Sequence, residues 1–312
     1  MDTATVARFE ASRNRLASLA YRLLGSAADA EDTVQDAFLR WQAADREYVE
    51  VPEAWLTKIV TNLAIDRLRS AKARHERTVG AWMPEPLLDG DPMLGPADTV
   101  EQRESVTLAV LTLMERLSPV ERAVYVLREA FSYSHAEIAD ILGITEAASQ
   151  QHAHRARRRI AAARTVAETD QAAARRIVEA FIAAASSGRT EHLVALLTDD
   201  ATAVSDGFGG LADKLIRHSG PERIAAIVRA GLKPSAAKRS LAGGSPTIYA
   251  AVVNASPAML FTLDDRVIGV AILDLRDNKI AAIHATAAPT RMARLTTAWQ
   301  QRAHDTPIIE SW

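Results

Sequence analysis

Cysteine is absent from this 312-residue chain, which excludes disulfide bonds and thiolate metal sites. Aromatic residues are scarce, at 5% of the sequence. No apolar run approaches the roughly 20 residues that a membrane helix needs, and residues 1–16 lack the apolar core of a signal peptide. We therefore expect a cytoplasmic protein without a membrane segment.

The composition, 48% hydrophobic and 24% charged, is that of a folded protein, and the length predicts two or three domains. The net charge of −2 argues against indiscriminate nucleic-acid binding, but the charges are segregated. Residues 28–53 hold eight acidic and two basic side chains, whereas residues 58–77 hold six basic and two acidic ones. An acidic surface suits a protein partner, and a basic surface suits phosphates.

Three helices are expected in the first part of the chain. Apolar residues at helical intervals predict the first over residues 9–24, and a glycine ends it. Asp29 is expected to cap the second, and Pro52 to begin the third. Trp41 and Trp55 fall on the apolar stripes of these two helices, so we expect them in the core of a compact bundle rather than stacked on bases.

Residues 78–100 carry four prolines and three glycines without a sustained period, which indicates a linker. Within it Trp82, Pro84, Glu85 and Pro86 form a stiff, partly apolar element that could dock onto another surface. A plain spacer fits the composition equally well.

Residues 132–163 are typical of a helix-turn-helix. Ile138 and Ile141 lie on one face of a first helix, Gly143 permits a tight turn, and Thr145 can cap a basic second helix. A solvated basic helix on an ordinary surface is the alternative. In the DNA-binding interpretation, arginines contact phosphates and the other side chains contact base edges or nearby backbone. The expected contacts are Thr145, Ser149, Gln150, His152, His154, Arg155, Arg157 and Arg158.

The remaining sequence predicts an α+β domain. Helices are expected over residues 169–188, 191–197 and 221–229. Segments rich in Val, Ile, Ala and Thr predict strands, with turns at Asp264-Asp265 and Asp277-Asn278. The strand segments are 201–205, 246–254, 258–264, 266–275 and 279–286.

Three segments together resemble an extracytoplasmic-function (ECF) sigma factor of the sigma-70 family: DAEDTVQDAFLRW, AWLTKIVTNLAIDRLRS and LSPVERAVYVLREAFSYSHAEIADILGITEAASQQHAHRARRRI. The resemblance covers about the first half of the chain. It implies that an acidic helix docks on core RNA polymerase, through Asp32, Gln35, Asp36, Phe38 and Leu39. It also implies that the third helix engages the −10 promoter element, through Lys58, Asn62, Arg67 and Arg69, and that the Thr145 helix engages the −35 element.

The C-terminal pattern resembles the SnoaL-like (cystatin/NTF2-like) fold, a conical α+β sheet that a subgroup of these sigma factors carries. The WMPEP segment resembles the linker motif of that subgroup. A glycine-rich loop is similar to a loop motif of the same subgroup, and its residues are Asp206, Gly207, Gly209, Gly210 and Lys214. The expected domains are therefore residues 1–77 and 101–166, both all-α, the linker 78–100, and a SnoaL-like regulatory domain over 167–312.

Five polar residues of this last domain could converge in the cone, which could hold a small hydrophobic molecule: Asp206, His218, Tyr249, Asp274 and His284. No nucleophile motif, metal-ligand spacing or phosphate loop accompanies them, so we expect no catalytic residue, cofactor or metal. Two alternatives stay open. One is a SnoaL-like enzyme or small-molecule sensor fused to a DNA-binding module, and the other is a one-component repressor that binds DNA without polymerase.

Overall fold

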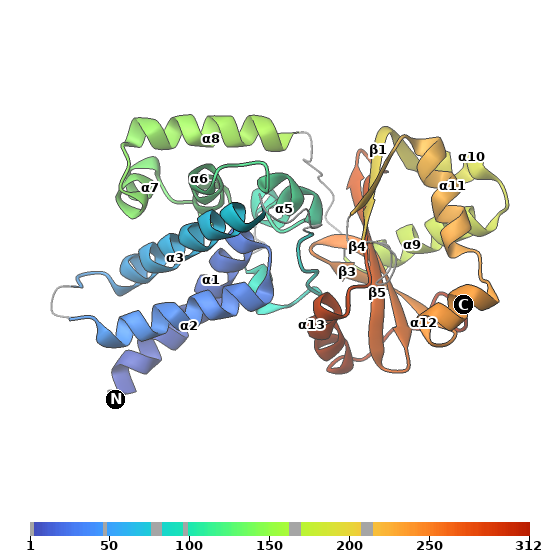
Figure 1. Cartoon of the computed structure of the whole chain (residues 1–312), viewed down its shortest axis with the longest axis horizontal. Coiled ribbons are helices and arrows are strands. Elements are labelled where there is room, and N and C mark those ends of the chain that lie inside the picture. Colours follow the sequence, from blue (N-terminus) through green and yellow to red (C-terminus); the bar gives the residue numbers. More distant parts are fainter. Residues whose placement is uncertain (1–2, 46–48, 76–82, 96–98, 162–169, 207–214) are drawn as a thin grey trace.

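A computed structural model describes residues 3–45, 49–75, 83–95, 99–161, 170–206 and 215–312 (Figure 1). The described chain begins with three helices, which are α1 (Thr3–Leu24), α2 (Ala27–Ala43) and α3 (Pro52–His75). The three helices expected before residue 77 are present. The predicted cap was wrong, because the side chain of Ser26 rather than Asp29 accepts the backbone N–H at the start of α2. Asp29 lies inside the first turn, where its charge favours the helix dipole.

The second helical region comprises α4 (Val100–Glu104), α5 (Leu108–Met114), α6 (Pro119–Glu129), α7 (His135–Leu142) and α8 (Glu146–Ile160). The predicted helix-turn-helix is α7 and α8. Gly143 ends α7 in the left-handed conformation, with φ of 65°, which a residue with a Cβ adopts at a cost. Thr145 caps α8 by accepting the backbone N–H of Ala148 at 3.1 Å.

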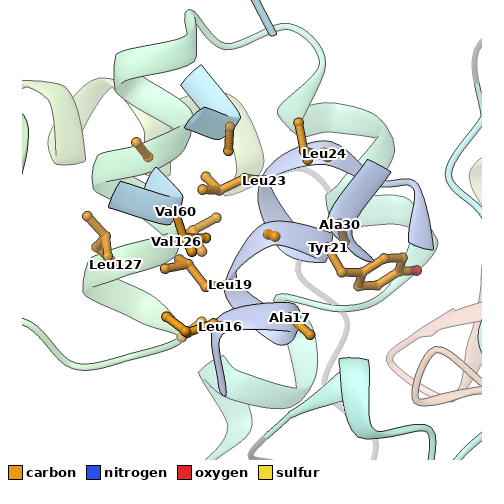
Figure 2. Packing of buried hydrophobic residues seen from close by; sticks show 14 of the residues in the cluster. Leu16, Ala17, Leu19, Tyr21, Leu23, Leu24, Ala30, Val60, Val126 and Leu127 are labelled. Carbon is orange, nitrogen blue, oxygen red and sulfur yellow. The ribbon is translucent and has the colours of Figure 1, made fainter. Parts of the chain in front are cut away.

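One hydrophobic core joins the two helical regions. Leu19 and Leu23 of α1 pack with Val60 of α3 and with Val126 and Leu127 of α6 (Figure 2). The two tryptophans belong to this core as predicted, with ring centroids 5.5 Å apart. The two regions are therefore packed directly against one another through one shared core.

Polar contacts reinforce this packing. The guanidinium of Arg122 on α6 is buried and donates to the carbonyl of Leu23 at 2.8 Å. The hydroxyl of Tyr133, before α7, accepts from Arg15 of α1 at 2.5 Å and lies 3.2 Å from the hydroxyl of Thr57 on α3. Helices α1 and α3 are thus tied to α6 and to the α6–α7 connection.

The C-terminal region is a six-stranded sheet in the order β2-β1-β6-β5-β4-β3. Its strands are β1 (Leu197–Ser205), β2 (Ile216–Ser219), β3 (Thr247–Val253), β4 (Ser256–Leu263), β5 (Arg266–Arg276) and β6 (Lys279–Thr286). All pairings are antiparallel except that of β1 with β6. The five predicted strands are present; β2 was not predicted. Both predicted turns have left-handed residues, at Asp264, Asp277 and Asn278.

Helices cover both faces of this sheet. One face packs against α9 (Gln171–Ser186), α10 (Thr190–Leu196) and α11 (Pro221–Leu232), and a short α12 (Ala236–Ala242) follows. The other face packs against α13 (Pro289–Gln300) and against Leu88 and Leu108 from the N-terminal half. The sequence did not predict α12 or α13. The α+β sheet domain is confirmed, and it lies against the helical regions (Figure 1).

The described part of the linker, residues 83–95, is docked rather than a plain spacer. Met83, Leu87 and Leu88 are buried, and a short 3-10 helix, η2 (Pro92–Leu94), follows. Leu88 forms an antiparallel bridge with Val253 at the edge strand β3. The linker is thereby attached to the edge of the sheet by a single β-bridge. Trp82 lies outside the described residues.

In the residues that the structure describes, no helix has the length and apolar character required to cross a membrane.

Candidate nucleic-acid and polymerase surfaces

Buried residues fix the rotation of α8 on the helix-turn-helix. They recur at helical spacing and face α6 and α7; they are Ser149, Ala153, Ala156 and Ile160. Ser149 was predicted to contact DNA, and the structure corrects this. Its side chain is fully buried, and its hydroxyl lies 2.9 Å from Nδ1 of His135, so it fastens α8 to α7 instead.

Three arginines of α8 point along its flanks toward α6. Arg155 and Arg159 contact the carboxylate of Glu121 at 3.0 and 2.8 Å, and Arg157 contacts Glu129 at 2.7 Å. Both glutamate side chains are less than one-tenth exposed, whereas the arginines are about half exposed. Arg155 and Arg157, predicted to bind phosphates, are therefore engaged within the protein in this conformation.

The carboxyl group of Glu121 is held in its charged form. Burial opposes its ionisation, but the backbone N–H of Ser118 and the guanidinium groups of Arg155 and Arg159 outweigh burial and lower the pKa of Glu121. Glu121 also completes the capping box of α6 with Ser118. One buried carboxylate thus fixes both the start of α6 and one flank of α8.

The other predicted contacts on α8 differ in whether a neighbouring side chain already contacts them. The Nδ1 atom of His152 lies 2.8 Å from the guanidinium of Arg155. Burial, and then the charge of Arg155, lower the pKa of His152, so its imidazole accepts this hydrogen bond in the neutral form. Gln150 is exposed and lies 3.5 Å from Glu146. His154 and Arg158 are exposed on the outer face of the helix.

The acidic face of α2 is the candidate polymerase surface. Gln35 and Leu39 are exposed, Leu39 by 55%, although a leucine is usually buried. Phe38 is partly buried against Phe9. Three carboxylates of α2 converge on Arg67 of α3, whose guanidinium lies within 4 Å of Asp29, Asp32 and Asp36.

Arg67 was predicted to contact the −10 element, but its shortest contact is with Asp36, at 2.9 Å. In this conformation it organises the acidic face of α2. Lys58 and Arg69 are exposed on α3, and Asn62 is partly exposed. These three residues stay candidates for promoter contacts.

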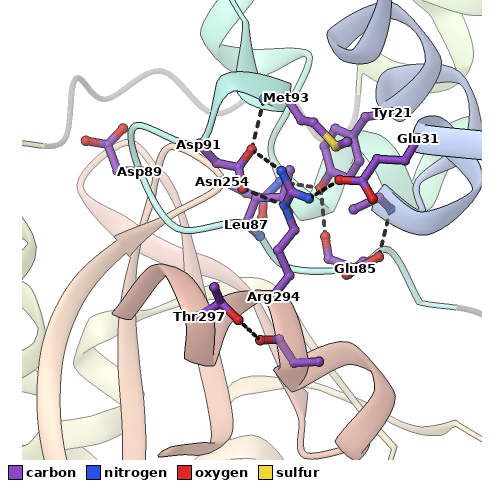
Figure 3. Close-up of polar contacts among 12 residues, drawn as sticks. Tyr21, Glu31, Glu85, Leu87, Asp89, Asp91, Met93, Asn254, Arg294 and Thr297 are labelled. Atoms are coloured by element: carbon purple, nitrogen blue, oxygen red, sulfur yellow. Dashed lines mark hydrogen bonds and ion pairs between the residues drawn. The ribbon is translucent and has the colours of Figure 1, made fainter. Parts of the chain in front are cut away.

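Asn254 lies at a junction of three parts of the chain (Figure 3). It is fully buried at the turn between β3 and β4, in the left-handed region with φ of 50°. Its Oδ1 accepts the N–H of Leu87 in the linker at 2.7 Å. Its Nδ2 donates to the hydroxyl of Tyr21 on α1 and to the carbonyl of Val106 before α5, both at 2.8 Å. One side chain therefore connects the sheet domain to the linker and to both helical regions.

Glu85 of the linker makes a second connection at this junction. Its carboxylate accepts the backbone N–H of Ala27, at the N-terminus of α2, at 2.7 Å, and its carbonyl accepts the hydroxyl of Tyr21 at the same distance (Figure 3). Burial raises the pKa of Glu85, although the hydrogen bond from Ala27 opposes this. The flanking Pro84 and Pro86 are buried, so the described part of the predicted docking element packs rigidly against the helical regions.

Arg294 of α13 makes a third connection. It donates to both carboxylate oxygens of Asp91 in the linker, at 2.7 and 3.0 Å, and to Glu31 of α2 at 2.6 Å (Figure 3). The side chain of Asp91 is almost buried, whereas that of Glu31 is more than half exposed. The C-terminal helix of the sheet domain therefore contacts the same helix that carries the candidate polymerase surface.

The five residues predicted to converge in a cone do not form one pocket. Asp274 and His284 pair at 2.9 Å and are buried on the face of the sheet that packs against α5 and α13. Asp206 instead accepts the backbone N–H groups of residues 287 and 288. Tyr249 packs its ring against α13, and His218 lies on β2. The loop residues Gly207, Gly209, Gly210 and Lys214 lie outside the described residues.

A cleft does open on the other face, between α9 and the turn joining β5 to β6. Its volume is about 250 Å³. Apolar side chains form most of its wall, with Arg176 and Asn278 among the lining residues. The cleft is somewhat smaller than the roughly 300–1,000 Å³ typical of ligand pockets.

Comparison with known proteins assigns both helical regions. The family model for sigma-70 region 2 matches residues 8–74, which are α1 to α3, and that for sigma-70 region 4 matches residues 107–160, which are α5 to α8. These two domains define a sigma factor of the sigma-70 class.

The full-length comparisons are more specific. The chain is 32% identical over 291 residues to the probable ECF RNA polymerase sigma factor SigI of Mycobacterium tuberculosis, covering 92% of this chain and 94% of that protein. It is 40% identical to the ECF RNA polymerase sigma factor SigJ of the same species over 65% of each chain. The crystal structure of SigJ superposes with a TM-score of 0.67 at 31% identity, over 92% of this chain and 97% of that one. The chain belongs to the ECF RNA polymerase sigma factor family.

Proposed function

We propose that this sigma factor binds core RNA polymerase through α2 and directs it to promoters through α3 and α8. The observation that carries this proposal is the pair of exposed, oppositely charged surfaces on the two matched sigma regions. The exposed leucine and acidic side chains of α2 suit a protein partner, and the outer face of α8 presents His154 and Arg158 to solvent.

The test is reconstitution of the full chain with core RNA polymerase, followed by run-off transcription from genomic promoter fragments. We expect specific transcripts that core polymerase alone does not produce. Co-purification with core polymerase separates this function from that of a one-component repressor, which binds duplex DNA alone. Leu39→Asp should abolish co-purification, because it places a charge in the apolar centre of the proposed contact. Leu241→Asp, at a similarly exposed leucine of α12 (63%), is a matched control.

The regulatory part of the proposal concerns the distance between the two promoter contacts. The positions of the −10 and −35 elements place them about 25 base pairs apart, which is roughly 85 Å along the duplex. In this structure α3 packs directly against α6 and α7, so its DNA-binding side chains lie in the same compact body as α8. The compact arrangement must open before one factor contacts both elements.

We propose that the C-terminal domain controls this opening. Asn254, Glu85 and Arg294 together connect it to α1, α2, the linker and the start of region 4. These contacts hold the two sigma regions in fixed positions. A ligand in the cleft beside α9 would be one signal for release, and a small hydrophobic molecule suits its wall. We propose no catalytic role, because the Asp274–His284 pair is covered by α5.

A further inference from the structure

The outer face of α8 is defined by residues that no other part of the described chain contacts through hydrogen bonds or ion pairs. With 3.6 residues per turn, the positions opposite the buried stripe are Ala147, Gln151, His154 and Arg158, and all four are exposed. Gln151 makes no side-chain hydrogen bond within the described residues. Its neighbour Gln150 lies a third of a turn away, beside Glu146.

The ion pairs of α8 keep its other long side chains away from this face. Glu121 holds Arg155 and Arg159 on one flank, and Glu129 holds Arg157 on the other. The contacts are made from α6, so the rotation of α8 is fixed from both sides. A duplex that approaches the outer face therefore meets Gln151 before it meets the arginine cluster.

Position along the helix separates base contacts from phosphate contacts. In a helix-turn-helix, residues of the N-terminal half of the second helix contact base edges in the major groove. Gln151 is the sixth residue of α8, and Arg158 follows two turns later, about 10 Å along the axis. The major groove is about 12 Å wide. When Gln151 lies over the base edges, Arg158 therefore reaches the phosphates at the wall of the groove.

We propose that Gln151 selects an adenine in the upstream promoter element. The side-chain amide of glutamine matches adenine in the major groove, because its oxygen accepts from N6 and its nitrogen donates to N7. No other base presents this donor and acceptor pair in that order. This inference rests on the proposed function, and it assigns to Gln151 a role that the arginine-rich sequence around it does not indicate.

The test selects preferred sequences from a random duplex library with full-length protein bound to core polymerase. The wild type and the variants Gln151→Ala, Gln150→Ala and Arg158→Ala are compared, and thermal unfolding checks that each is folded. We expect an enriched motif that contains an adenine. Gln151→Ala should reduce the preference for that adenine roughly 5- to 150-fold, as loss of one bidentate base contact does. Gln150→Ala should keep the preference, and Arg158→Ala should weaken binding to all sequences alike.

Two results would overturn the proposal while leaving the proposed function intact. One is an enriched motif whose adenine preference survives Gln151→Ala. The other is loss of that preference in Gln150→Ala instead. If the wild-type complex enriches no motif at all, promoter recognition itself is refuted, and the role of Gln151 with it.

Discussion

Replacing Asn254 with alanine should release the sheet domain from the two sigma regions. The substitution removes the partners of three groups at the junction: the N–H of Leu87, the hydroxyl of Tyr21 and the carbonyl of Val106. Leaving a buried polar group unsatisfied costs about 1–3 kcal/mol. The alanine must also adopt a positive φ, which costs about 1–2 kcal/mol, but this cost falls on the β3–β4 turn in the docked and the open state alike and does not shift the balance between them. Tyr21 retains its bond to the carbonyl of Glu85, which limits the loss at that hydroxyl.

We therefore expect the docked arrangement to lose about 3–6 kcal/mol, since not all of these terms add. That corresponds to a shift of roughly 10²- to 10⁴-fold toward the open state. The chain lacks cysteine, so cysteines introduced at exposed Ala54 on α3 and Ser240 on α12 supply its two thiols, which a mixture of donor and acceptor dyes can label. Energy transfer between the labels should fall in Asn254→Ala, and transcription with core polymerase should rise.

Asp264→Ala is the matched control. It places alanine at an equally left-handed position, with φ of 52°, in the exposed β4–β5 turn. The positive φ should cost the β4–β5 hairpin about as much free energy as it costs the β3–β4 turn in Asn254→Ala, but the junction should stay closed. If the two variants show the same energy transfer and the same transcription, Asn254 does not hold the regions together, and the regulatory proposal is wrong.

Three further changes test neighbouring parts of the reasoning. Arg294→Ala should strengthen binding to core polymerase in a titration of the two, because it frees Glu31 on α2; unchanged affinity would contradict this. Glu121→Gln should lower the melting temperature and release Arg155, so that the salt dependence of DNA binding steepens by roughly one phosphate contact. Because the pKa of Glu85 is raised, the folded state binds its proton more tightly than the unfolded state does. Its contribution is thus greatest at low pH and is lost as pH rises through the raised pKa. Wild-type stability relative to Glu85→Gln should increase in thermal unfolding as the pH is lowered from neutral toward the ordinary pKa of a glutamate, and a constant difference would refute this.

Local patterns predicted the three helices of region 2, the helix-turn-helix of region 4 and five strands, because each has an apolar face that one segment reveals by itself. Helix α13 also carries such a signal, since Met292, Leu295 and Trp299 recur at helical spacing and are buried. Strand β2 has only four residues and no buried stripe, so its sequence carries little information. The β3–β4 turn was missed because Asn254 is followed by alanine rather than glycine.

The candidate site was less predictable, because its contacts join residues far apart in the sequence. The arginines of α8 predicted a basic DNA-binding surface, but the orientation of three of them depends on Glu121 and Glu129, which lie 28 to 38 positions earlier. Nothing in the local pattern indicates that these carboxylates are buried beneath α8. The burial of Ser149 could have been inferred, since it shares a helical stripe with Ala153 and Ala156.

The junction links polymerase binding to domain opening by mass action. Arg294 contacts Glu31 on the face of α2 proposed to bind polymerase, and its other partner, Asp91, belongs to the docked linker. If polymerase binding displaces Arg294 from Glu31, it stabilises the state in which the sheet domain has moved, and conversely an opened junction raises the affinity for polymerase by the same factor. An effect of Asn254→Ala on polymerase affinity, although Asn254 does not touch α2, would therefore reveal this coupling. Equal polymerase affinity in Asn254→Ala and wild type, with the junction open by energy transfer, would show that α13 does not compete with polymerase.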